Sequence, residues 1–364
     1  MKKLSQYIFT VILLVLSMVI WASATDGIEK NFKETEKELY ALIDDDIKSV
    51  INFDNLESID SSSIESVSRF FSETLNSKIY GVLKFTLVII AVIMLISAFS
   101  LTFTNCNLLD LLSVLSVILL TVSKTSHLIN MSLSSVSLCS KFMLGFIPIY
   151  AGIIAFSGNT ATAVSYNSIS LMFAEGLSFF GSAFASKVVG GYYCLTISFA
   201  PNENINLNSF VNAFNKFITF SFGILSSLFA TFLTIRSVLS SAVDTVSAKG
   251  IRLLISSTIP IIGGAISEAF STLAGSINVL KSSVAVVGII VLLIIIIPSV
   301  TEGFLYYISL NFLSYIGELC NCRRIAELTK ALSIGIKFLI MLQILQLFLL
   351  IISTALMLTI KSVV

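Results

Sequence analysis

The sequence predicts an all-α protein that crosses a membrane several times, with an N-terminal signal peptide and a small helical extracytoplasmic head. Of its 364 residues, 56% are apolar and only 12% are charged, against about 25% charged residues in ordinary globular domains. The apolar runs are long and continuous rather than alternating, which favours helices over a β-barrel. Helices also satisfy their own backbone hydrogen bonds, as hydrocarbon requires.

The first 24 residues have the three parts of a secretory signal. Lys2 and Lys3 supply the positive charge, Leu4 to Trp21 supply the apolar stretch, and Ala22-Ser23-Ala24 forms an A-x-A cleavage site. An uncleaved first membrane helix is the alternative interpretation. Either way, the residues that follow are expected on the far side of the membrane from the cytoplasm.

Residues 25–80 are expected to form the acidic extracytoplasmic head. They hold 13 acidic and 6 basic residues, a net charge of −7. Apolar residues recur at helical spacing in two stretches, and Ser62 and Glu65 form an S-x-x-E capping box for the second helix. The head is either a docking arm for another protein or a helical hairpin that rests on its own membrane domain.

Residues 81–364 are expected to form a transmembrane domain of about 7–8 spans, since hydrocarbon about 30 Å thick needs about 20 helical residues. The candidate spans are Val82–Leu101, Leu108–Ser123, Lys141–Ser157, Ser168–Ser186, Phe210–Ile235, Val284–Pro298, Phe304–Leu319 and Ser333–Ile360. Counting these spans from an external residue 80 places two basic clusters, at 236–252 and 323–330, on the cytoplasmic side, as the positive-inside rule favours.

Signatures of catalysis are scarce in this sequence. The one histidine, His127, falls in a polar connection between two predicted spans. No H-E-x-x-H, G-x-S-x-G or P-loop motif occurs. The five cysteines are scattered and show no metal-binding spacing. We therefore predict no catalytic, cofactor-binding or metal-ligating residue and no enzymatic activity, and the net charge of +1 gives no reason to expect nucleic acid as a partner.

The stretch 235–298 is the most distinctive part of the chain. An amphipathic section is followed by Pro260 and a glycine pair, which loosen a helix and predict a re-entrant or interfacial segment at 237–275. Broken helices often line substrate paths in transporters, and a kinked helix without a substrate is the alternative. The candidate structural or pathway residues are Asp244, Lys249, Pro260, Gly263, Gly264, Glu268, Lys281, Gly288 and Pro298.

Two further features bear on packing within the body. Small residues recur every four positions at Ala174, Ser178, Ser182, Ser186 and Gly190, a stripe that lets a second helix approach closely, within the chain or between subunits. Charged residues inside spans usually face a protein interior or a water-filled path. Glu175, Glu268 and Lys281 are the candidates for such internal pairs.

The stretch 235–298 resembles the stage III sporulation protein AE family of endospore-forming bacteria. The matching residues are Asp244, Lys249, Pro260-Ile261-Ile262-Gly263-Gly264 with Ser267, then Lys281, Gly288 and Pro298. The order of a signal peptide, an acidic head and a polytopic body also agrees. No catalytic residue is carried over from the family.

The resemblance implies a component of a channel or feeding-tube complex that links mother cell and forespore. Its place would be the mother-cell membrane that becomes the outer forespore membrane, and late forespore development would depend on it. The implied partners are the other proteins of the stage III operon, including a secretion-type ATPase, an insertase of the Oxa1/YidC type and membrane lipid. A conduit is expected to need several copies. The alternative function is an autonomous permease that uses the broken helix at 253–281.

Overall fold

The computed structural model describes residues 61–102, 107–156, 160–202, 205–227, 230–231, 234 and 263–358. Within these residues all regular structure is helical. The helices are α4 (Ser61–Thr102), α5 (Asn107–Phe156), α6 (Thr160–Phe179), the π-helix η2 (Phe180–Ala185), α7 (Ser186–Phe199), an unlabelled helix at 207–227, α9 (Gly263–Leu319) and α10 (Arg323–Leu358). The predicted signal peptide and most of the head lie outside the described residues.

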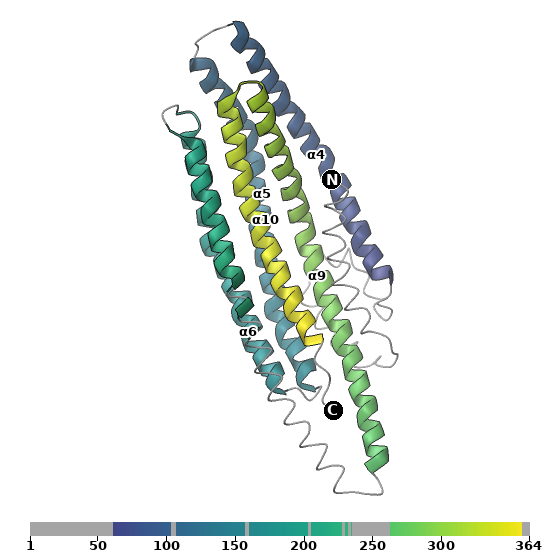
Figure 1. Cartoon of the computed structure of the whole chain (residues 1–364). Helices are drawn as coiled ribbons and strands as arrows, with labels where there is room; N and C mark the ends of the chain where they lie inside the picture. The colour runs from purple at the N-terminus through teal and green to yellow at the C-terminus, as the bar shows by residue number, and fades with distance from the viewer. Residues whose placement is uncertain are drawn as a thin grey trace.

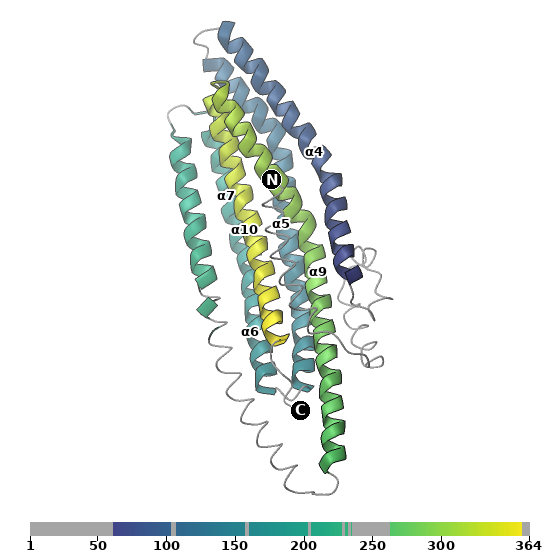
Figure 2. The same cartoon turned by 45° about the vertical axis from the view of Figure 1, so that its right-hand side comes forward.

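The long helices run side by side in an elongated bundle, up and down along one axis (Figures 1 and 2). α9 packs against α10, α4 and α5, and α5 packs against α6 as well. A short turn joins α9 to α10 at one end of the bundle, drawn at the top (Figure 1). By length and composition, four helical stretches could each cross a membrane: Ser68–Phe99, Leu111–Ala155, Ser282–Leu319 and Arg323–Thr354.

The break predicted between the spans at 108–123 and 141–157 is wrong, because α5 is one helix of 50 residues that includes His127. Its hydroxyls bond to the helix itself, as when Thr121 donates to the Val117 carbonyl at 2.8 Å and Ser140 to the Val136 carbonyl at 3.0 Å. Such bonds let polar residues stay inside a helix. The polar stretch at 124–140, between the two predicted spans, is therefore part of a helix and not a loop.

The break predicted between the spans at 284–298 and 304–319 is also wrong. α9 continues through Pro298 for 57 residues. A proline removes one backbone donor, which neighbouring helices at membrane depth can tolerate. The predicted sidedness of 236–252 and 323–330 rests on two spans between them, whereas the described part of that interval, Gly263–Leu319, is one helix. The helix at 207–227 also runs parallel to α10, away from the end that carries Arg323.

α6, η2 and α7 form one helical rod from Thr160 to Phe199, longer than the span predicted at 168–186. The π-helical turn at Phe180–Ala185 inserts one extra residue into the helical repeat. Residues after it are therefore rotated relative to residues before it. At Gly181, within this turn, an added Cβ would lie 2.6 Å from the Val136 Cγ1 of α5, so the rod and α5 are closely packed there.

Two buried cores follow one another along the bundle. The first joins α4, α5, α7, α9 and α10 and includes Ile89, Val117, Leu313 and Leu339. The second joins α5, α6 and α9 and includes the stacked rings of Phe142, Phe146 and Tyr150 against the 284–296 stretch of α9. The boundary between the two cores coincides with a layer of polar side chains, which defines the candidate site.

Candidate functional site

A buried carboxylate marks the middle of the bundle. Glu302 lies four residues after Pro298 on α9, and only 7% of the residue is exposed. Its Oε2 lies 2.7 Å from Lys78 Nζ of α4, and its Oε1 lies 3.7 Å from His127 Nε2 of α5. A buried charge is costly unless it is paired. Glu302, Lys78 and His127, here called the Glu302 layer, therefore tie three helices together at one level.

Two buried glutamines of α10 extend this polar level toward the second core. Gln343 donates to Ser299 Oγ at 2.6 Å and to the Ser132 carbonyl at 3.2 Å. Gln346 donates to the Val136 carbonyl at 3.1 Å and to Ser140 Oγ at 3.0 Å. Buried polar groups need hydrogen-bond partners, and these amide donors find theirs on neighbouring helices. They fix α10 against α5 and α9.

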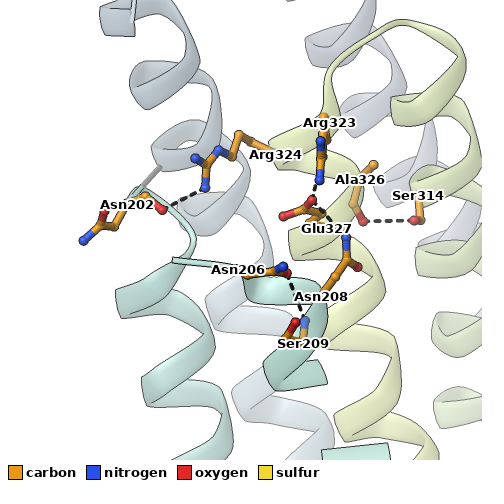
Figure 3. A network of polar contacts seen from close by, with 9 residues as sticks. All are labelled: Asn202, Asn206, Asn208, Ser209, Ser314, Arg323, Arg324, Ala326 and Glu327. Atoms are coloured by element: carbon orange, nitrogen blue, oxygen red, sulfur yellow. Dashed lines mark hydrogen bonds and ion pairs between the residues drawn. The ribbon is translucent and has the colours of Figure 1, made fainter. Parts of the chain in front are cut away.

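A second polar cluster closes the end of the bundle where α9 turns into α10 (Figure 3). Glu327, which is buried, accepts bonds of 2.9 Å from Arg323 Nε and from Asn208 Nδ2. Arg324 Nη1 donates to the Asn202 carbonyl at 2.8 Å. This cluster, here called the polar cap, joins α10 to the connection that leads into the helix at 207–227.

The sequence around the polar cap explains its tight turns. Asn321 adopts a left-handed conformation with φ of 60°, which asparagine tolerates better than most residues. At Gly317 an added Cβ would lie 3.1 Å from the Ala326 backbone nitrogen, so glycine permits the close approach of α9 and α10. Asn206 Oδ1 accepts from the Ser209 backbone N–H at 3.1 Å, a side-chain N-cap for the next helix.

The Glu302 layer and the polar cap are one bilayer thickness apart. On α4, Lys78 belongs to the layer, and Ser97 Oγ donates to the Cys320 carbonyl beside the cap at 3.3 Å. The 19 residues from Lys78 to Ser97 span about 28 Å at about 1.5 Å per residue. The hydrocarbon core of a typical bilayer is about 30 Å thick.

Large apolar side chains point outward between these two polar levels. Leu87 of α4 is 64% exposed, Leu119 of α5 is 79% exposed and Phe312 of α9 is 52% exposed. A water-soluble surface rarely carries apolar patches of this extent. This apolar belt is the surface that lipid would cover.

The structure describes the surroundings of only some of the predicted pathway residues. Asp244, Lys249 and Pro260 lie outside the described residues. Four others belong to the helical backbone of α9, but their surroundings are not described: Gly263, Gly264, Glu268 and Lys281. Because 263–281 is continuous helix, the predicted break does not extend into it. The re-entrant or interfacial interpretation of 237–275 and the permease path at 253–281 stay predictions, since most of that stretch lies outside the residues with described side chains.

Gly288 and Pro298 are the two predicted pathway residues with described surroundings. An added Cβ at Gly288 would overlap the Phe146 ring, so this glycine serves close packing of α9 on α5 in the second core. Pro298 lies one residue before Ser299, which accepts from Gln343. Gly288 is therefore a packing position, and Pro298 is half-buried beside the Gln343 contact.

The small-residue stripe is divided by the π-helical turn. Ala174 is buried in the second core, Ser178 is half-buried, and the side chain of Ser182 is not described. Ser186 is half-buried, and an added Cβ at Gly190 would meet nothing within 4 Å. Whether the stripe joins subunits stays a prediction. Glu175 is exposed, so the expected internal pair at this residue is wrong.

Sequence reasoning missed Glu302, Lys78, Gln343, Gln346 and Glu327. Glu302 was assigned to a break between spans, and Lys78 to the head. The available signal was an acid four residues after Pro298, between two long apolar runs, because a charge within such a stretch needs a partner. Among the described residues, no group of three or more metal-ligating side chains comes together.

A bundle of long apolar helices with a lipid-compatible belt and paired internal charges defines a polytopic helical membrane protein. Comparison with protein families gives its identity more narrowly. The sequence model of the stage III sporulation protein AE family matches residues 46–360, so the chain belongs to this family. A search of curated proteins and a search of solved structures found no match.

Proposed function

We propose that this protein is a non-catalytic subunit of a channel-type or feeding-tube complex that links mother cell and forespore. Membership of the stage III sporulation protein AE family supports a role at this stage of sporulation. In the proposal the protein lies in the mother-cell membrane that becomes the outer forespore membrane. Late forespore development depends on it.

In this proposal the bilayer covers the apolar belt between the Glu302 layer and the polar cap. The polar cap faces the cytoplasm, because Arg323, Arg324 and Lys330 cluster near it and cytoplasmic ends are enriched in basic residues. The opposite half of the bundle, with the second core, then projects out of the membrane. From Glu302 back to Gly263, α9 has 39 further residues, about 58 Å of helix.

The observation that carries the proposal is an apolar ridge on the projecting half. Val164, Met172 and Phe179 of α6 are spaced by eight and seven residues, so they lie on one face of the helix. They are 67%, 70% and 71% exposed. Because this ridge lies beyond the proposed bilayer, a partner protein is the surface that would shield it from water.

The partners belong to the proposal as well. They are the other membrane proteins of the stage III operon, with a secretion-type ATPase supplying energy from the cytoplasm, and an Oxa1/YidC-type insertase that assists insertion. Several copies of this chain are expected in one complex.

Purification of the tagged full chain from sporulating cells tests the proposal. We expect the other stage III operon products to be recovered with it, and deletion of the gene to abolish late forespore gene expression. An unrelated tagged mother-cell membrane protein is the control. Recovery of the chain alone, with normal forespore expression after deletion, would contradict the proposal.

Substitutions on α6 make the test specific to the ridge. Met172→Glu with Phe179→Glu places charges on the ridge and should reduce recovery of the operon products. Lys187→Gln, at an exposed position of α7, changes charge off the ridge and should leave recovery unchanged. Equal recovery from both variants would show that the ridge is not a partner surface.

A further inference from the structure

The helix at 207–227 is held against the bundle in one fixed rotation. Phe214 stacks on Tyr192 of α7 with ring centroids 3.8 Å apart and planes inclined by 12°, and Phe222 packs edge-on against Phe338 of α10 at 5.5 Å. Lys337 Nζ donates to Asn215 Oδ1 at 3.0 Å, a polar contact beside this aromatic packing. These contacts determine which side chains of the helix face outward.

One outward side of this helix suits lipid. Phe217, Phe220 and Ile224 are 39%, 68% and 46% exposed and recur at helical spacing. Ala213, also exposed, lies on the same side. This side continues the apolar belt.

The neighbouring outward side does not suit lipid. Five exposed residues recur there at spacings of three and four, so they form one line along the helix. They are Asn212, Lys216, Thr219, Gly223 and Ser227. We name this line the Lys216 stripe. Charged residues at the centre of a membrane helix cost about 2.5–3.5 kcal/mol on insertion scales.

Lys216 lies well below the polar cap. It is nine residues past Leu207, where the helix begins, and so about 14 Å along the helix. Among the described residues, no carboxylate forms an ion pair with Lys216. Its charge therefore calls for an acidic group from outside the described part of the chain.

The rest of the stripe is shaped for close contact with a helix rather than for water. Thr219 Oγ1 donates to the Asn215 carbonyl at 3.0 Å, and Ser227 Oγ donates to the Gly223 carbonyl at 2.8 Å. Their hydroxyl protons are thus used within the helix. An added Cβ at Gly223 would meet nothing within 4 Å, so the surface there is open. Small residues at such spacing let two membrane helices approach closely.

We infer that the Lys216 stripe is the docking surface for a transmembrane helix of another subunit, one that carries a carboxylate facing Lys216. The inference rests on the proposed function, since that function supplies the other subunits. A second copy of this chain docked stripe to stripe would place two lysines together, and like charges at an interface are unfavourable. A helix of a different subunit avoids this repulsion, and it is the occupant that we propose.

The test compares recovery of the stage III operon products with tagged full-chain variants from sporulating cells. Lys216→Glu reverses the charge and Gly223→Leu fills the open surface, and each should reduce recovery at least about tenfold, corresponding to about 1.4 kcal/mol. Lys216→Arg keeps the charge, and Ala213→Leu adds the same bulk to the lipid side. These two controls should stay within about twofold of wild type, well under 1.4 kcal/mol.

Thermal unfolding of each purified variant shows whether it is folded, and we expect unchanged midpoints because all three positions are exposed. If the wild-type chain recovers the operon products and the Lys216→Glu and Gly223→Leu variants recover them equally well, the docking inference is overturned. The proposed function would still stand. Disulfide-linked dimers of a Gly223→Cys variant without the other operon products would show that a second copy binds there instead. Loss of wild-type recovery would remove both proposals.

Discussion

α4 and α9 are both long apolar helices, yet they meet opposite surroundings. Only 22% of the apolar span of α4 is buried, against 78% of the apolar span of α9. α4 lies at the edge of the bundle and presents Leu83, Leu87 and Leu95 outward. α9 packs against α4, α5 and α10, and its residues 284–296 are all buried.

The apolar composition of a segment indicates how strongly it avoids water, but not whether lipid or protein takes the place of water around it. For α4 the replacement is lipid in the proposed bilayer. For residues 284–296 of α9 it is protein, including the Phe146 ring of α5. A run such as Ile294 to Ile296, which by sequence is a membrane span, is in this fold the core of a helical bundle.

The largest expected effect contrasts two leucines. Leu292 on α9 is 0% exposed, and Leu292→Ala should lower the free energy of unfolding by about 2–5 kcal/mol, because it leaves a cavity. Leu87 on α4 is 64% exposed, and Leu87→Ala should change it by no more than about 0.5 kcal/mol. Thermal unfolding of both purified variants in one detergent measures the difference. Equal losses would refute the contrast between the helices.

The next effect concerns the charge that joins the two helices. Lys78→Met leaves Glu302 buried with only exposed His127 nearby, and the expected loss is about 3 kcal/mol. Adding Glu302→Gln removes the buried charge and should restore at least half of that loss. A double-mutant cycle on unfolding free energies measures the coupling. Additive effects would mean that the Lys78–Glu302 contact does not stabilise the bundle.

A smaller effect tests how closely α9 approaches α5. Gly288→Ala forces a methyl group into the Phe146 ring, and overpacking of this kind costs about 1–3 kcal/mol. Gly81→Ala on α4 is the matched control, because an added Cβ there meets nothing within 4 Å. Alanine is the better helix former by about 1 kcal/mol, so the control should be neutral or stabilising. A neutral Gly288→Ala would contradict the close packing described for α9.

The smallest effect concerns Asn206 in the polar cap, which belongs to neither α4 nor α9. Asn206→Ala removes the side-chain N-cap of the helix at 207–227 and should cost about 1 kcal/mol. Ser209→Ala keeps the backbone N–H that Asn206 caps, so it should have little effect. Unfolding midpoints of the two variants check this. A larger loss for Ser209→Ala would show that the bond does not set the start of the helix.

The positions of helices were largely predictable, whereas their ends were not. The start of α4 at Ser61 lies one residue from the predicted capping residue Ser62. The middle of α5 was predicted as a loop because serine, lysine and histidine cluster there. That pattern carries no information on Gln343 and Gln346 of α10, which donate hydrogen bonds to the Ser132 and Val136 carbonyls of this stretch.

The candidate site was less predictable than the fold. Gly288 was singled out by the sequence, but the reason for a glycine there is a ring that comes from 142 residues earlier in the chain. Glu302, Lys78 and His127 lie far apart in sequence, so nothing local connects them. The Lys216 stripe follows from helical spacing once the rotation of its helix is known, and that rotation is set by Tyr192 and Phe338.

The sequence alone determined that the chain is helical, apolar and a member of a sporulation family, because composition and motif are properties of the chain itself. The tertiary structure decided which apolar residues face lipid and which face protein, since that depends on neighbours brought together by folding. It also decided that Glu302 is paired and that Gly288 is close-packed. These are relations between distant residues, and only their distances in space can settle them.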